Sequence, residues 1–312
     1  MSSDDQVEPT VSIILPTYNR WPFLNYAIQS VIAQTFSAWE LIVVDDGSTD
    51  ATPAFLADLG DERIQIMTLE HCGNPALVRN RGIEAARGKY VAFLDSDDEW
   101  TPQKLCVQIT AMERHPDCQW SYTAVTLIDP KGQTLPQERF KSWHPYSGRI
   151  LEKLLAHDAM VACASVVVTR ELVNQAKGFD ETYLFSGDYE LWIRLARMSR
   201  VLAIPRQLAK VRIHPTTHTY RQPEVNAAFA RIYENVLSTN PSARVRRICR
   251  RQVAFYRAYY ADQLAAGGAY GSALRHLVGA FRYHPVSRRA WRVLGKHVIR
   301  RLAHAIGRSN RK

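Results

Sequence analysis

The chain has 312 residues, of which 46% are hydrophobic and 22% charged, a composition that excludes disordered, collagen-like and disulfide-scaffold proteins. Its net charge of +10 is unevenly distributed, because residues 1–219 carry −6 whereas residues 220–312 carry +16, from 19 basic and 3 acidic side chains. The five cysteines are scattered, without a CxxC pair, which favours reduced thiols over disulfides or a zinc site. We therefore expect the positive charge of the C-terminal part to serve a role separate from that of the rest of the chain.

No targeting or membrane-spanning segment is evident in the sequence. The first residues are acidic and polar, and the longest uncharged run, from Trp21 to Trp39, is interrupted by polar side chains. Neither pattern is typical of a secretory signal or a transmembrane helix. We therefore expect a cytoplasmic protein.

The first hundred residues predict strands and helices in alternation. The uninterrupted β-branched run that begins at Val11 favours a strand buried on both faces. Ser48 or Asp50 could cap the second helix, and Gly88 could close the third. The alternation predicts a Rossmann-like α/β fold, with a mostly parallel sheet and helices on both faces. The predicted strands are 11–15, 40–44, 63–69 and 89–94, and the predicted helices are 22–32, a short one that carries Phe55 and Leu59, and 75–87.

Beyond residue 101 the pattern loosens, and it changes again near residue 220. There the strand signals end, and helical stretches broken at Pro241, Gly267 and Pro285 predict an all-helical region. We expect a flexible tail at 1–9, one catalytic domain at 10–219 and a basic helical extension at 220–312. The elements predicted between are helices at 102–114 and 186–199, strands at 120–128 and 164–168, and two short strands within 200–213.

Polar clusters follow three of the predicted strands. They are Pro16 to Asn19, Asp45 to Ser48, and Asp95 to Asp98. Parallel sheets bind ligands beyond the carboxyl ends of their strands, so the three clusters together predict one binding crevice. The second cluster alone is better explained as an ordinary turn.

The last of these clusters has the chemistry of a metal site. Asp95 and Asp97 are two positions apart at a strand end, where both can lie near one Mg²⁺ or Mn²⁺ ion that bridges to substrate phosphates. The alternative is a cap for the helix that follows. Neither GxxxxGK[ST] nor GxGxxG occurs, which argues against a Walker loop or a dinucleotide fold.

Six motifs in order make residues 10–219 resemble the family 2 glycosyltransferases of the type A (GT-A) fold. The resemblance implies metal-dependent transfer, with inversion, of a sugar from a nucleotide-sugar donor to an acceptor hydroxyl. The donor is expected to be a UDP-sugar, and the acceptor a glycan or a lipid-linked molecule in polysaccharide, glycolipid or cell-envelope glycan synthesis. The motifs are VSIILPTYNR at 11, ELIVVDDGSTD at 40, VRNRGIEAARGKYVAFLDSDDEW at 78, GFDE at 178, SGDYELWIRLA at 186 and VRIHP at 211.

The resemblance also assigns roles to residues. Asp188 matches the catalytic base, although Gly187 stands where members of the family often have Glu. By its position alone, Asp188 could equally be the N-cap of the helix at 186–199, and His214 an ordinary surface or core histidine. The implied nucleotide-binding residues are Pro16, Tyr18, Asp46, Arg79, Asp95 and Ser96, and the implied ligands of Mn²⁺ or Mg²⁺ are Asp97 and His214.

The last helix is basic and amphipathic. We hypothesise that residues 286–312 bind the anionic inner face of the cell membrane, where a lipid-linked acceptor would lie. The alternative is a helix that only packs on its neighbours. Nucleic-acid binding would explain this charge but none of the acidic turns, so no nucleic acid is expected. A nucleotide-sugar-binding or scaffold protein without turnover is a further alternative. The apolar stripe of the helix comprises Trp291, Leu294, Val298, Leu302 and Ile306.

Overall fold

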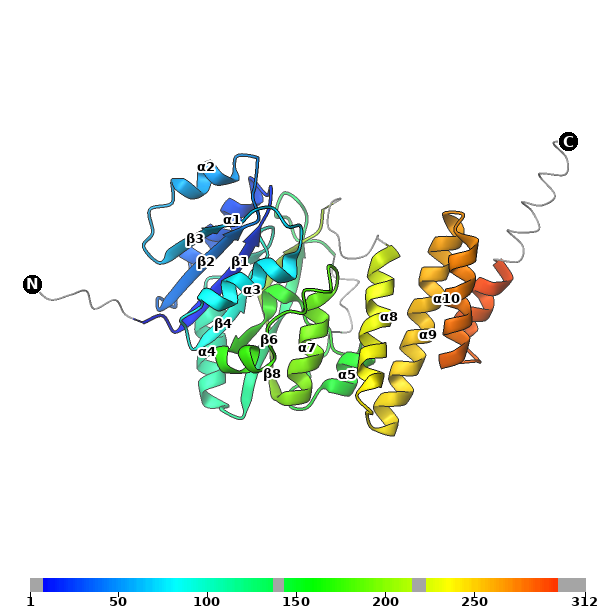
Figure 1. Cartoon of the computed structure of the whole chain (residues 1–312). Helices are drawn as coiled ribbons and strands as arrows, with labels where there is room; N and C mark the ends of the chain where they lie inside the picture. The colour runs from blue at the N-terminus through cyan, green and yellow to red at the C-terminus, as the bar shows by residue number, and fades with distance from the viewer. Residues whose placement is uncertain (1–7, 137–142, 215–222, 297–312) are drawn as a thin grey trace, which may run out of the picture. The chain divides into compact units, whose positions relative to one another are not determined.

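The computed structural model describes residues 8–136, 143–214 and 223–296. The chain divides into two compact units, Met1–Thr216 and Thr217–Lys312 (Figure 1). Most of the expected tail at 1–9, and the expected boundary between residues 219 and 220, lie outside the described residues.

The described part of the first unit contains an eight-stranded mixed sheet, whose strands lie in the order β3-β2-β1-β4-β7-β6-β8-β5. Strands β3, β2, β1 and β4 run parallel, and β7 pairs antiparallel with both β4 and β6. The predicted α/β fold with a largely parallel sheet is confirmed. The strands are β1 Val11–Thr17, β2 Trp39–Asp45, β3 Ile64–Thr68, β4 Tyr90–Phe93, β5 Glu99–Trp100, β6 Cys118–Ile128, β7 Val167–Thr169 and β8 Arg200–Arg212.

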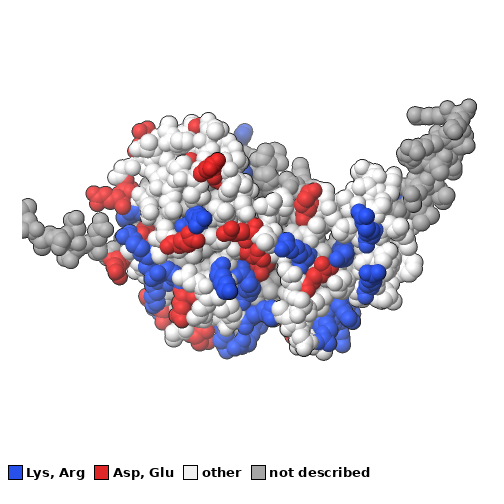
Figure 2. Space-filling model, viewed as in Figure 1, with Lys and Arg blue, Asp and Glu red and all other residues white. Residues whose placement is uncertain are grey.

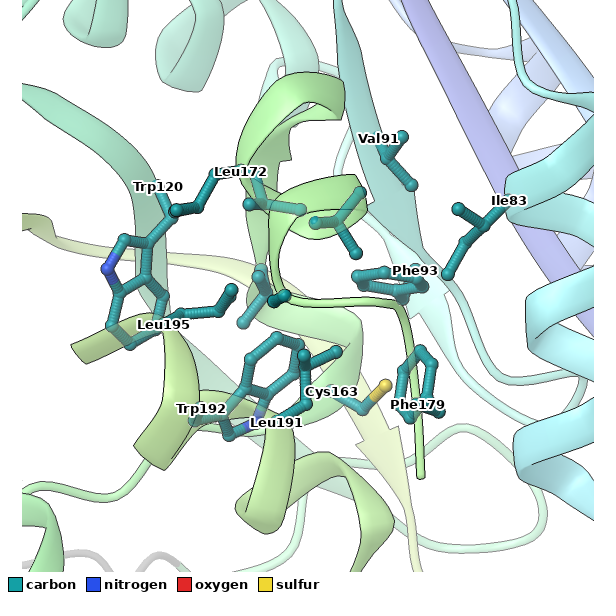
Figure 3. Packing of buried hydrophobic residues seen from close by; sticks show 14 of the residues in the cluster. Ile83, Val91, Phe93, Trp120, Cys163, Leu172, Phe179, Leu191, Trp192 and Leu195 are labelled. Carbon is teal, nitrogen blue, oxygen red and sulfur yellow. The ribbon is translucent and has the colours of Figure 1, made fainter. Parts of the chain in front are cut away.

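Helices cover both faces of this sheet, as predicted (Figure 1). Alternate residues of β1 enter different cores: Ile14 packs with residues of α3, α6 and α7, whereas Ile13 packs with residues of α1 and α4. Both faces of the strand are therefore largely apolar, which explains the run of Val11, Ile13, Ile14 and Leu15 around the single polar residue Ser12. Figure 3 shows the first of these cores. The helices are α1 Phe23–Ile32, α2 Thr52–Ala57, α3 Pro75–Ala85, α4 Lys104–Arg114, α5 Leu151–Leu155, α6 Arg170–Gln175 and α7 Gly187–Met198.

Gly88 does not close α3, contrary to the prediction. The helix ends at Ala85, and Gly88 lies against the start of β1, where its N–H donates to Ser12 Oγ at 2.8 Å. A Cβ on Gly88 would lie 2.7 Å from the backbone nitrogen of Ser12. The glycine therefore permits a close approach of two backbones rather than a helix end.

The prediction of two short strands within 200–213 is also wrong. One strand, β8, runs through the segment and pairs in parallel with β6. Its register against β6 shifts after Ile204, so that Pro205 falls where the ladder is irregular. Proline cannot donate to a ladder and is tolerated at such irregularities, so the strand continues past it.

The second unit is helical in its described part, as predicted. It contains α8 Pro223–Ser238, α9 Ala243–Ala266, α10 Tyr270–Tyr283 and a further helical segment at 288–296. Among the described residues, none of the helices combines the length and apolarity needed to cross a bilayer. Lys and Arg side chains are spread over this unit in Figure 2.

The predicted apolar stripe of the last helix is only partly right. Ala290 and Val293 are the buried residues of the helical segment, and Leu294 is half-buried, whereas the Trp291 side chain is 58% exposed. The Trp291 ring lies against Phe281 of α10, with 4.8 Å between the centroids, whereas Ala290 and Val293 enter the buried cluster with α9 and α10. The rest of the stripe, Val298, Leu302 and Ile306, lies outside the described residues.

Candidate functional site

The polar segments after β1 and β2 are joined by hydrogen bonds. The Asp46 N–H donates to the Thr17 carbonyl at 2.9 Å, and the Asn19 N–H donates to Ser48 Oγ at 2.9 Å. Strand β4 lies on the other side of β1, so the segment after it opens at the same edge of the sheet. The polar clusters after these strands therefore lie at one edge of the sheet, as expected, because the strands before them run parallel. Neither Ser48 nor Asp50 is the N-cap of α2, a position held by Ala51.

Asp46 organises the segment that follows β3. Its two carboxylate oxygens accept hydrogen bonds from the backbone N–H groups of Cys72 and Gly73, both at 2.9 Å. Burial alone raises the pKa of Asp46, but these hydrogen bonds and the nearby His71 lower it below its usual value. Asp46 is therefore a buried, ionised acceptor beside Tyr18, whose ring is 39% exposed. Pro16, within β1, is half-buried nearby.

Arg79 joins two acidic parts of the site. Its guanidinium donates to Asp95 Oδ1 at 2.5 Å and lies over the Phe179 ring, 5.4 Å from the centroid. Burial by itself lowers the pKa of Arg79, but the charges of Asp95 and Asp188, among others, raise it. Arg79 thus remains a cation within the electrostatic reach of both carboxylates.

Asn80 explains why the GFDE motif lies at this site. Its amide donates to the Phe179 carbonyl at 2.9 Å and its side-chain oxygen accepts from the Phe179 N–H at 2.8 Å. Gly178, with φ of +63°, leaves room for this amide, since a Cβ there would lie 2.5 Å from Asn80 Oδ1. Helix α3 therefore positions the aromatic ring under Arg79.

Asp188 lies in the first turn of α7 and not at its N-cap. The N-cap is Ser186, in the left-handed region with φ of +59°. Asp188 Oδ1 accepts from the Tyr189 N–H at 2.8 Å. Burial raises the pKa of Asp188, and the charge of Arg79 opposes that effect only in part. A carboxyl group with a raised pKa is suited to proton transfer.

Asp97 and His214 are brought together although 117 positions separate them. His214 Nε2 lies 2.8 Å from Asp97 Oδ2, and the imidazole stacks on Phe23. Burial raises the pKa of Asp97, but the hydrogen bond from His214 and the charge of Arg20 hold it below its usual value. Ser96, between the two aspartates, is buried. Asp97 therefore stays ionised.

Two buried groups support this pair. The Arg212 N–H donates to Asp98 Oδ1 at 2.9 Å, and Arg212 Nε donates to the Asp97 carbonyl at 2.9 Å. The Arg212 guanidinium also pairs with Glu99. Burial, followed by the charges of Asp97 and Asp95, raises the pKa of Asp98 well above its usual value. These contacts explain why β5 forms: it pairs with β8 beside Arg212.

The sequence reasoning missed His71, Cys163 and Arg212. His71 stacks on Tyr18, and Cys163 is a buried thiol whose pKa is raised well above its usual value by burial and by the charge of Asp95. Figure 3 shows Cys163 beside Phe179 at the edge of the core. His71 could have been found by the rule that ligand-binding residues follow the carboxyl ends of parallel strands, because β3 ends at Thr68 on the same edge of the sheet. No comparable signal marks Cys163.

The residues that could hold a divalent cation are a carboxylate and an imidazole. Asp97 and His214 are already adjacent, and oxygen and nitrogen donors of this kind suit Mn²⁺, with carboxylates preferred by Mg²⁺. In the described part of the chain no group of three or more His, Cys, Asp or Glu side chains is arranged to hold a metal. The pair therefore fits an ion that takes its other ligands from substrate phosphates and water.

The sequence matches known glycosyltransferases. Residues 12–176 match the family described as Glycosyl transferase family 2. The chain is 35% identical over 216 residues to an uncharacterized glycosyltransferase of Rickettsia felis, covering 68% of this chain and 34% of the relative. It is 32% identical over 197 residues to the Escherichia coli UDP-Glc:alpha-D-GlcNAc-diphosphoundecaprenol beta-1,3-glucosyltransferase WfgD, covering 62% and 72%. The match thus spans about a third of the length of the Rickettsia relative.

Solved structures share the fold. Staphylococcus aureus TarS 1–349 in complex with UDP-GlcNAc superposes with a TM-score of 0.63 at 18% identity, covering 81% of this chain and 80% of that one. The mannosyltransferase PcManGT of Pyrobaculum calidifontis, in complex with GDP-Man and Mn²⁺, superposes with a TM-score of 0.60 at 16% identity, covering 96% and 89%. At these identities the likeness establishes the architecture.

Replacing Arg79 with methionine should destabilise the protein. The Asp95 carboxylate would lose its cation, and we expect the free energy of unfolding in urea to fall by about 2 kcal/mol. The loss is smaller than for a fully buried pair because the Asp95 side chain is 31% exposed. Arg81→Met is the matched control: its pair with Glu84 is 50% and 62% exposed, so its loss should leave the free energy of unfolding nearly unchanged. Equal losses in the two variants would contradict the role of Arg79.

Proposed function

The chain belongs to glycosyl transferase family 2 and is a glycosyltransferase, and we propose that it transfers a sugar with inversion from a UDP-sugar to a hydroxyl of a glycan or lipid-linked acceptor. The observation that carries the proposal is the ion pair of Arg79 with Asp95, in a position where the charge of Asp188 also acts on the Arg79 guanidinium. Through its charge, Arg79 connects Asp95, which is proposed to contact the donor, with Asp188, which is proposed to be the catalytic base.

The donor part comprises the segments after β1, β2 and β4. The exposed Tyr18 ring offers a stacking surface for the nucleobase beside Pro16, and Asp46 offers an anionic acceptor for a ring N–H. Each carboxylate oxygen has a second lone pair, so Asp46 can accept from a base while it holds the segment after β3. Asp95 and Ser96 would face the ribose. Both WfgD, by its name, and TarS, by its bound ligand, use UDP-sugars.

Asp188 would act as the general base. It removes the proton from the acceptor hydroxyl as the oxygen attacks the anomeric carbon, and the nucleoside diphosphate leaves from the opposite face. A single displacement inverts the anomeric configuration. The charge of Arg79 opposes the effect of burial on the pKa of Asp188, because a nearby positive charge favours the carboxylate form that a general base requires.

Asp97 and His214 would hold the metal ion. Asp97 supplies an ionised carboxylate, and the imidazole beside it supplies nitrogen once the two separate to receive the cation. Bound Mn²⁺ or Mg²⁺ supplies Lewis-acid neutralisation of charge on the departing diphosphate. Arg212 fixes the backbone at Asp97 so that the carboxylate keeps its place. PcManGT, which has the same fold, was solved with Mn²⁺.

The acceptor belongs to cell-envelope glycan synthesis in this proposal. WfgD is named for a sugar linked through a diphosphate to undecaprenol, a lipid that resides in a membrane. The described part of the basic helix presents exposed Arg288, Arg292 and Lys296 beside exposed Trp291. Cationic side chains around an amphipathic indole suit an anionic membrane surface. The second unit would therefore hold the enzyme at the inner leaflet of the membrane.

Asp188→Asn should abolish transfer while nucleotide binding persists. Loss of a general base lowers turnover by about 10²- to 10⁴-fold, whereas the nucleotide pocket is left unchanged. Turnover is measured as release of UDP with a candidate lipid-linked acceptor, and binding by calorimetry with UDP. Asp158→Asn removes a carboxylate that is 49% exposed and should leave turnover unchanged. Turnover of Asp188→Asn at the wild-type rate would refute the assignment of the base.

Removal of divalent cations should stop transfer. Treatment with EDTA is expected to abolish UDP release, and added MnCl₂ or MgCl₂ should restore it, because Asp97 and His214 alone cannot neutralise the leaving diphosphate. Asp97→Asn should raise the Mn²⁺ concentration needed for half-maximal rate by at least about tenfold. Full turnover in EDTA would exclude the metal.

Neutralising the last helix should weaken membrane binding. The triple variant Arg288→Gln/Arg292→Gln/Lys296→Gln should co-sediment with anionic vesicles at least about tenfold more weakly than the wild type, since each cation contributes about 1 kcal/mol near such a surface. The control, Lys131→Gln/Lys177→Gln/Arg206→Gln, removes the same charge from exposed positions of the first unit and should bind as the wild type does. Equal binding of all three proteins would refute the membrane role.

A further inference from the structure

The His71 side chain lies on the two residues that the proposed function gives to the nucleobase. Its imidazole stacks on the Tyr18 ring with 4.0 Å between the centroids and 16° between the planes. Its Nδ1 lies 3.0 Å from Asp46 Oδ2 and 2.9 Å from the Asp46 carbonyl oxygen. The imidazole therefore engages both the stacking surface and the anionic acceptor.

The backbone around His71 is held in place by neighbouring contacts. Asp46 binds the N–H groups of Cys72 and Gly73, the residues that directly follow His71. Gly47, with φ of +70°, allows the segment to come close, since a Cβ there would lie 3.0 Å from the His71 nitrogen. The His71 side chain is nevertheless 47% exposed. Its ring can therefore turn toward solvent without moving the backbone.

An imidazole has the two features that a nucleobase would use at this site, a flat ring and an N–H donor. Uracil is a flat ring with a ring N–H beside its carbonyl groups, and imidazole is a flat ring with an N–H. A base that stacks on Tyr18 and donates to Asp46 must lie on the face of the tyrosine ring that is turned toward Asp46. The imidazole lies on that face, as its contact with Asp46 shows.

We propose that His71 occupies the nucleobase position between Tyr18 and Asp46, and that the uracil of the donor displaces it on binding. The inference rests on the proposed function, which assigns Tyr18 and Asp46 to the base. His71 then sets nucleotide affinity: each binding event loses one stack and one hydrogen bond within the protein before it gains the same two contacts with the ligand. The displacement lowers the apparent affinity, because only molecules with the ring turned out can accept the base.

Calorimetry with UDP and MnCl₂ on the full chain tests the proposal. His71→Ala should bind UDP three- to tenfold more tightly than the wild type, because nothing competes for Tyr18 and Asp46. His71→Phe keeps a ring on Tyr18 without the N–H and should gain less. His115→Ala removes an exposed imidazole from the end of α4 and should bind as the wild type does. Unchanged or weaker binding by His71→Ala overturns the proposal.

A second measurement follows His71 itself in the wild-type protein. With ¹³C-labelled histidine, the His71 resonance is identified by its loss in His71→Ala, and stacking on Tyr18 should place it upfield. Added UDP should move it downfield toward the position of an unstacked histidine. A further upfield shift would mean that the base stacks on His71, and an unmoved resonance would mean that it binds elsewhere; either result overturns the proposal.

Failure of the inference can be told from failure of the proposed function. Wild-type protein that binds UDP, with an unmoved His71 resonance and no gain in His71→Ala, refutes the displacement alone. Wild-type protein that binds neither UDP nor GDP in the presence of MnCl₂ refutes the nucleotide site, and the displacement with it.

Discussion

The concentration of carboxylates at one edge of the sheet is the constraint on which the rest of the site depends. Asp95, Asp97 and Asp98 follow a single buried strand, and Asp188 enters from α7. Like charges so close together cannot all be ionised and buried unless cations are built in beside them. Arg79 and Arg212 meet that requirement, and the interaction of Arg79 with both Asp95 and Asp188 makes two distant segments one site.

Side chains of the candidate site also hold the fold together. Asp46 holds the backbone after β3 through two N–H groups, and that backbone carries His71 onto Tyr18. Asp98 accepts from the backbone of β8 and so fixes the strand that ends just before His214. These hydrogen bonds fix the positions of the neighbouring charged groups, as a preorganised site requires.

Much of this could be predicted because it depends on short-range pattern. The mostly apolar runs 11–15 and 40–44 became strands buried on both faces, and their order implied a parallel sheet whose loops meet at one edge. Predictions failed where a residue far away in the sequence determines the local structure. Pro205 suggested a break, but pairing with β6 carries the strand past it at an irregular register. Gly88 suggested a helix end, but its role is set by the backbone of β1, 76 positions earlier.

By itself the sequence determined the α/β alternation, the helical basic extension and the identity of the acidic residues at the strand ends, since each follows from residues near one another in the chain. The tertiary structure decided which of those residues meet. Asp97 pairs with His214 across 117 positions, and Arg79 with Asp95 across 16. It also decided that His71 stacks on Tyr18. Such contacts depend on which strands and helices lie side by side, and the spacing of residues along the chain carries no record of that arrangement.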